Sequence, residues 1–157
     1  MTFPNSSLYA ANLLAGWAAG ATDIDLDGAS RLKIALYTDS MVQDPTGGTA
    51  LGYSATGELS GTGYTATGKV LGGTVTWAVN SGLLVCSTSA VTDWTGATFS
   101  NVYGCVIYDD SATSPVADAC IVAVKFGSVG SSGGGTFTID WADTPVTNTI
   151  FTIDPTP

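Results

Sequence analysis

The stretch NVYGCVIYDDSATSPVADACIVAVKFG, residues 101–127, decides the fold class of this chain. Residues 101–109 and 117–127 are rich in Val, Ile, Tyr and Cys, a composition typical of β-strands, and the second is apolar enough for a central strand. Between them, DDSATSP (109–115) has the Asp, Ser and Pro residues that favour a turn. The stretch therefore predicts two successive strands connected by a turn.

Similar patterns continue on both sides of this stretch. We expect further strands, in chain order, at residues 31–38, 74–79, 83–87, 136–142 and 149–154. Asn80-Ser81-Gly82 separates the second of these from the third and predicts a hairpin. Residues 92–100 are predicted to be a connector, and the composition of SVGSSGGG (128–135) predicts a flexible segment.

A helix is predicted only near the N-terminus, at residues 6–18. Ser6 can cap its first turn, and Tyr9, Leu13 and Trp17 recur at the spacing of one helix face. This stripe predicts that the helix packs through these side chains, either on its own sheet or on a partner.

These elements together predict an all-β protein with one short N-terminal helix. Residues 39–56 are predicted to be a long loop, and the glycines of 57–73 predict tight turns around short strands. About 7–8 short strands at this spacing favour an antiparallel β-sandwich or barrel. We expect a single domain over residues 1–157 with its β core at 31–154.

The charge composition excludes several kinds of partner. The chain has 4 basic and 13 acidic residues and a net charge of −9. Binding to DNA or RNA requires Lys and Arg to neutralise phosphates, so we expect no nucleic-acid partner, and an anionic membrane surface is disfavoured for the same reason. Charged residues make up only 11% of the chain, so its surface must be built mainly from Ser, Thr, Gly and Asn.

The beginning of the chain does not resemble a secretion signal. It has no positively charged segment, its apolar run is interrupted by Asn12, and no stretch is long enough to span a membrane. We therefore expect the protein to be made in the cytoplasm.

The three cysteines are Cys86, Cys105 and Cys120. Each lies in an apolar, β-like stretch and none forms a CxxC pair. This context predicts buried, reduced thiols that act as small apolar side chains, as expected for a reducing cytoplasm. A disulfide between two of them is possible but is not predicted.

The aspartates of DIDLDG (23–28) are candidate metal ligands. Asp23, Asp25 and Asp27 alternate before a glycine, as in the first half of an EF-hand calcium loop. The twelfth position of such a loop should be Glu, but here it is Ile34, and a strand is predicted where the second helix should begin. We therefore predict a solvated lead into the strand and keep a weak or bridging calcium site as the alternative.

No other group of residues predicts catalysis. The chain has no histidine, which excludes Ser-His-Asp and Cys-His chemistry. The glycine segments do not match a phosphate-binding loop, because none ends in GK[ST]. The remaining candidates for paired acids are Asp109, Asp110, Asp118, Asp140 and Asp143, and no spacing places two of them at a working distance. We expect no enzymatic activity and no cofactor.

Three segments together resemble a known group of proteins. They are LKIALYTDS (32–40), GELSGTGYTATGKVL (57–71), and VYGCVIYDD with SPVADACIVAVKFGS (102–110 and 114–128). Their order is similar to small virion structural proteins of tailed bacteriophages. That group has a "K-ALYT" strand, an "EVSGTGYTAGG" turn, a "VIYDD" strand and turn, and a final "DFGS…G-FTI" hairpin. The resemblance covers residues 31–141.

This resemblance implies a component of the phage particle. The first expectation is a capsid decoration, or cement, protein on the head surface, made in the host cytoplasm, with the major capsid protein as partner. Three-fold sites on such a shell favour a homotrimer. We expect the helix or the loop 39–56 to make the contacts, with the candidate residues Tyr9, Leu13, Trp17, Met41 and Tyr53.

Two alternatives remain open. A tail or baseplate component, or a module that binds the host surface, would expose aromatic side chains on loops, for example Tyr53, Tyr64 or Trp94. An enzyme acting on cell-wall sugars would use a pair of the aspartates named above.

Overall fold

A computed structural model describes most of the chain. The described residues are 6–19, 24, 26, 31–45, 49, 51–143, 146 and 148–153, and of residues 16–19 only the backbone is described.

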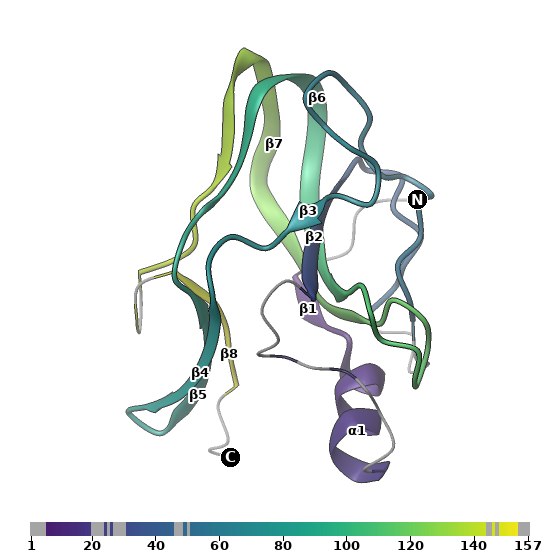
Figure 1. Ribbon diagram of the computed structural model, residues 1–157, viewed down its shortest axis with the longest axis vertical. Coiled ribbons are helices and arrows are strands. Elements are labelled where there is room, and N and C mark those ends of the chain that lie inside the picture. Colours follow the sequence, from purple (N-terminus) through teal and green to yellow (C-terminus); the bar gives the residue numbers. More distant parts are fainter. Residues whose placement is uncertain are drawn as a thin grey trace.

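Two antiparallel sheets and one helix make up these residues (Figure 1). The elements are β1 (Ser7–Leu8), α1 (Ala10–Ala19), β2 (Leu32–Tyr37), β3 (Lys69–Val70), β4 (Val75–Asn80), β5 (Leu83–Thr88), β6 (Thr92–Asp109), β7 (Cys120–Ile139) and β8 (Thr149–Ile153). One sheet has the order β1-β7-β6-β2-β3 and the other β4-β5-β8. The prediction of an all-β, sandwich-like fold with a short N-terminal helix is confirmed.

The largest feature is the hairpin of β6 and β7. Its pairing runs from Tyr108↔Cys120 near the turn to Thr92↔Ile139 at the far end, and it is interrupted by several register shifts. In Figure 1 both strands rise side by side, bend over at the top and descend toward the second sheet. Asn101, with a φ of 63°, lies within the register shift between Phe99 and Val102 and contributes to the bend.

Two predictions about this hairpin were wrong. Residues 92–100 are the first half of β6, not a connector, and the glycine-rich 128–135 belongs to β7, not to a flexible segment. Of the strand predicted at 136–142, residues 136–139 are the last part of β7, which ends at Ile139. Glycine in a strand often marks a bulge or a bend, and Gly133 and Gly135 pair with Thr98 and Ala97.

The hairpin predicted at Asn80-Ser81-Gly82 is confirmed. β4 and β5 pair in continuous register from Val75↔Thr88 to Asn80↔Leu83. The two turn residues both have positive φ, 50° at Ser81 and 87° at Gly82, which is the geometry of the tight hairpin turn that fits the twist of the strands.

The helix begins later than predicted. Residues 6–18 were expected to be helical, but Ser7 and Leu8 form β1, which pairs with β7, and the backbone N–H of Tyr9 donates to Ile121 O at 2.9 Å. The helix therefore begins at Ala10, because the preceding residues already have their hydrogen-bond partners in the sheet.

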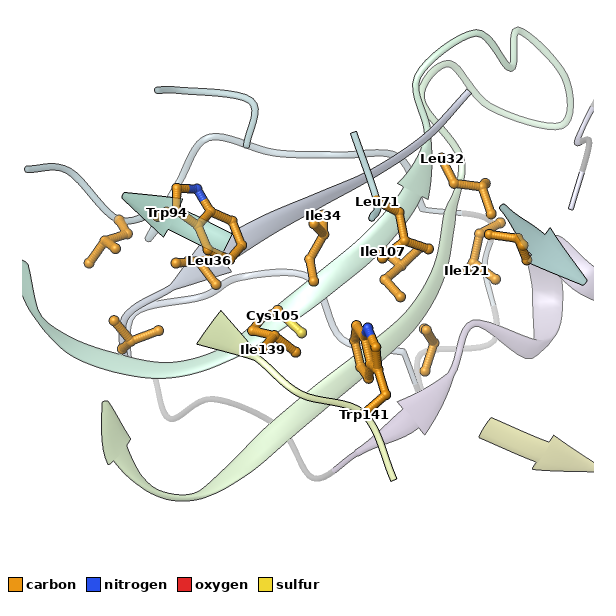
Figure 2. Close-up of a cluster of buried hydrophobic side chains, with 14 of the residues drawn as sticks. Leu32, Ile34, Leu36, Leu71, Trp94, Cys105, Ile107, Ile121, Ile139 and Trp141 are labelled. Carbon is orange, nitrogen blue, oxygen red and sulfur yellow. The ribbon is translucent and has the colours of Figure 1, made fainter. Parts of the chain in front are cut away.

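β2 is buried on both faces. Leu32, Ile34 and Leu36 face the main core together with Trp94 and Trp141, as Figure 2 shows. The opposite face, with Ala35 and Tyr37, packs in a second cluster with Tyr9, Met41 and Tyr108. Met41 belongs to this second cluster, and Leu51 and Tyr53 pack against it, so these residues of the predicted long loop 39–56 are part of the packed structure.

Candidate functional site

The candidate calcium ligands Asp23, Asp25 and Asp27 lie outside the described residues. Their neighbours Ile24 and Leu26 are partly buried against the main core. Within the described ranges, no three acidic or cysteine side chains are grouped so that they could hold a metal ion.

The residues predicted to contact a partner lie mostly inside the protein. Tyr9, Leu13 and Met41 are buried, and Tyr53 is half-buried. The side chain of Trp17 is outside the described part of the chain. Tyr9 and Leu13 of the predicted stripe thus pack inside the chain's own fold, and the large apolar side chain that the described part of α1 exposes is the neighbouring Leu14, which is 63% exposed.

One carboxylate, Glu58, joins the loops around β2. Tyr53 Oη donates to Glu58 Oε2 at 2.5 Å, and Tyr64 Oη donates to Glu58 Oε1 at 2.7 Å. Tyr64 Oη also accepts a hydrogen bond from the backbone N–H of Leu36 at 3.0 Å. Burial, reinforced by the hydrogen bond to Glu58, raises the pKa of both tyrosines, so they stay protonated and remain donors.

This role of Glu58 was not predicted from the sequence. It is the acidic residue in GELSGTGYT, the turn segment that carries part of the resemblance. An acidic residue six positions before a tyrosine in a glycine-rich turn would have been the available signal.

Glycines of the same turn segment touch neighbouring backbone. A Cβ atom at Gly68 would lie 2.0 Å from Ile34 O, and one at Gly63 would lie 2.9 Å from the Cα of Ala97. Both glycines have positive φ, 67° and 77°. They let the segment 57–68, here called the glycine loop, lie directly on β2 and β6.

The predicted acidic candidates separate into two groups. Asp109 and Asp110 lie at the end of β6, with Asp118 near them, whereas Asp140 and Asp143 follow β7. The two groups therefore do not form one site.

Each acid at the end of β6 has a cationic partner. Asp109 is fully buried and receives two hydrogen bonds from Arg31, at 3.3 and 3.1 Å, and two from Ser111, at 3.0 and 2.9 Å. Lys33 Nζ lies 2.8 Å from Asp110 Oδ2. These contacts fix the turn after β6 to the start of β2, which is a structural role.

The three cysteines are free and buried, as predicted. Burial raises the pKa of Cys86 and of Cys120 to about 12 and raises that of Cys105 as well. Thiols in such surroundings are poor nucleophiles at neutral pH.

The aromatic residues named for surface recognition are not exposed. Trp94 is buried and Tyr64 and Tyr53 are half-buried, so the expectation of exposed aromatic side chains at these positions was wrong. Trp94 packs with Tyr64, at 6.3 Å between ring centroids, and with Phe137, at 6.1 Å. Trp141 lies in the core and is 7% exposed.

A small polar pocket lies beside this aromatic group. It is lined by Lys69, Asp93 and Trp94 together with the glycine loop. Lys69 Nζ lies 5.7 Å from the centre of the Trp94 ring and donates to the backbone oxygen of Asp93. The ammonium group is therefore already engaged by the chain itself, and the Asp93 carboxylate in the lining accepts a hydrogen bond from Thr138 Oγ1 at 2.6 Å.

No known protein family, curated protein or solved structure matches this chain. None of the described helical residues forms a helix of the length and apolarity required to cross a membrane.

Proposed function

We propose that this protein is a structural component of a tailed-bacteriophage particle, most specifically a decoration protein on the head surface. In this role it binds the major capsid protein, assembles as a homotrimer and holds neighbouring capsid subunits together. In this role the protein binds other protein surfaces and does not catalyse a reaction.

The observation that carries the proposal is that residues of the three resembling segments contact one another in the fold. Tyr64 of the SGTGYT segment bonds to β2, Gly68 lies against Ile34 of the K-ALYT strand, and Asp110 of VIYDD is paired with Lys33 of that strand. The three segments on which the resemblance rests therefore pack on one another. Their side chains stabilise the fold, as expected for a protein that works as a building block.

The described surface also fits this role. It is built largely from Ser, Thr and Gly, and the acidic groups at the end of β6 are paired with Arg31 and Lys33. Surfaces made mainly of uncharged residues can pack on another protein without bringing like charges together.

The first test is the number of copies per particle. Purified particles would be separated by gel electrophoresis or digested for quantitative mass spectrometry, and this protein would be counted against the major capsid protein. A ratio near one supports a role over the whole head. A few copies per particle would contradict it and favour the tail.

The second test concerns the helix. The exposed Leu14 is the apolar residue that α1 offers to a partner, so L14E should weaken binding of the purified protein to capsids that lack it, measured by co-sedimentation. V129E is the matched control, because Val129 is 50% exposed on β7. Equal binding by both variants and the wild type would exclude a contact through α1.

A further inference from the structure

The edges of the two sheets differ in length. The five-stranded sheet ends at β1 and β3, which have two residues each, and β3 carries Lys69. Very short edge strands and edge lysines prevent pairing with other chains. The three-stranded sheet instead ends at β4, an edge strand of six residues.

The pairing register shows which backbone groups β4 presents. In a two-residue hairpin the residues that flank the turn exchange hydrogen bonds, and such pairs alternate along the strands. Asn80, Ala78 and Thr76 therefore bond to β5, while the N–H and C=O groups of Val75, Trp77 and Val79 point away from it. Among the described residues no strand pairs with this side of β4.

The strand is also held in an extended shape. The ring of Trp77 packs edge-on against Phe151, with 5.4 Å between centroids, and its Nε1 donates to Leu26 O at 3.2 Å. β4 and β5 pair without any register shift. An incoming strand would meet an edge that is already in the pairing conformation, which lowers the entropy cost of binding.

The distribution of charged residues indicates which strand pairs with the free side of β4. None of the 4 basic and 13 acidic residues falls between residues 70 and 92 or between 144 and 153, so the β4-β5-β8 sheet has no charged side chain. Two copies of a chain with net charge −9 repel each other over most of their surfaces. They can approach closely through this uncharged sheet, where β4 has neither a lysine nor a proline to prevent pairing.

The edge is complementary to itself. In an antiparallel pair centred on Trp77, the Val79 of one copy lies opposite the Val75 of the other. The three residues of β4 whose backbone groups point away from β5 therefore pair with the same three residues of the second copy. Val79 is 77% exposed, the most exposed large apolar residue in the described part of the chain, and this pairing would cover it. A two-fold contact of this kind closes on itself and leaves neither β4 edge unpaired.

We propose that β4 pairs with the β4 of a second copy of this chain, edge to edge and antiparallel, and so joins the two three-stranded sheets into one six-stranded sheet. The contact does not depend on the phage role proposed above. It uses a surface different from α1 and is compatible with a three-fold contact elsewhere.

The test compares two lysine substitutions in the full chain. V79K places an ammonium group on the paired edge, and V129K places the same charge on an exposed valine of β7. Molar mass would be measured by light scattering and sedimentation equilibrium from about 1 μM to about 1 mM, because a contact through one strand is expected to be weak. Thermal melts would show that both variants fold.

The expected result is a wild-type mass that doubles as the concentration rises. V79K should remove this doubling, whether the smaller unit is a monomer or a trimer, and V129K should keep it. Hydrogen exchange followed by mass spectrometry should show protection of the peptide covering residues 75–80 that increases with concentration.

Three outcomes with the purified chain alone would overturn the proposal. They are a wild-type mass that does not double by about 1 mM, a doubling that V79K leaves intact, and concentration-dependent protection on α1 or β7 while residues 75–80 stay unprotected. If β4 is protected only after a capsid protein is added, its occupant is a foreign strand and the two-fold contact is excluded.

Discussion

At the scale of single residues, glycines of the glycine loop are required because they have no Cβ atom. Gly68 has positive φ, and a Cβ there would overlap the carbonyl oxygen of Ile34. The sequence correctly predicts a turn at this glycine, because glycine is the usual residue for such backbone angles. It cannot show that the turn lies on β2, since that contact joins residues far apart in the chain.

We expect G68A to lower the free energy of unfolding by about 2 kcal/mol or more, because the methyl group meets backbone and the left-handed conformation is strained. Urea denaturation measures the change. G133A is the control, since nothing lies within 4 Å of a Cβ at that strand glycine and its φ is not in the left-handed region. Equal effects of the two substitutions would contradict the close contact of Gly68 with β2.

The cysteines give a second prediction at this scale. With the pKa of Cys86 and Cys120 raised to about 12 and that of Cys105 raised as well, a thiol reagent such as DTNB should react with the native protein at pH 8 at least about a hundredfold more slowly than with free cysteine.

In guanidinium chloride all three thiols should react rapidly, which is the control for this measurement. One thiol that reacts rapidly in the native protein would show that its stretch of strand opens or is exposed.

At the scale of elements, predictions succeeded where the apolar pattern was strong and failed where it was weak. The strands at β2, β4, β5 and β8 were predicted within a few residues because their buried side chains alternate or cluster. Residues 92–100 and 128–135 have mixed or glycine-rich sequences, and they are strands because each pairs with the other. Pairing partners of this kind cannot be inferred from local composition.

The position of α1 depends on a polar residue that the sequence analysis did not single out. Asn12 is fully buried, its Nδ2 donates to Leu51 O at 2.7 Å and to Cys120 O at 2.6 Å, and its Oδ1 accepts from Leu51 N at 3.1 Å. One side chain thus connects the helix, the loop over β2 and the start of β7.

We expect N12A to lower the free energy of unfolding by about 1–3 kcal/mol, because it removes the hydrogen bonds that Asn12 makes with the Leu51 N–H and with the carbonyl groups of Leu51 and Cys120. L14A on the exposed side of the same helix is the control and should change stability by less than about 0.5 kcal/mol. Denaturation midpoints of the two variants measure the difference, and a neutral N12A would mean that α1 is docked mainly by Tyr9 and Leu13.

At the scale of the whole molecule, the excess of acidic residues creates a dependence on pH. Asp118 lies near Asp110 and Lys33, and its pKa is raised, mainly by burial and then by the charge of Asp110. A raised pKa in the folded state means that Asp118 favours folding when protonated, below its ordinary value of 3.8, and that this contribution is lost as the pH rises through the folded pKa.

D118N should therefore be more stable than the wild type at pH 7, and the difference should shrink as the pH falls toward about 3. Asparagine also tolerates the positive φ of 52° at this position. The check is a series of urea melts of both proteins across this range. A difference that grows at low pH would mean that the charged form of Asp118 stabilises the fold.

The candidate site illustrates what a sequence can show at this scale. Composition alone indicated a chain with few reactive side chains, and the described residues place Tyr9, Leu13 and Met41 in its own core. Leu14 and Val79 are exposed positions that can contact a partner. Their exposure depends on which side of α1 and of β4 faces the core, and tertiary packing decides that. The role in a phage particle stays a prediction from the motifs.

The long β6–β7 hairpin also suggests an order of folding. Its turn joins neighbouring apolar segments, so pairing can begin there with little loss of chain entropy and extend residue by residue toward the glycine-rich end. β5 ends just before β6 begins, and β8 starts shortly after β7 ends. As the hairpin closes, it brings β5 and β8 together, although most of the chain's second half separates them, and the smaller sheet can complete itself last.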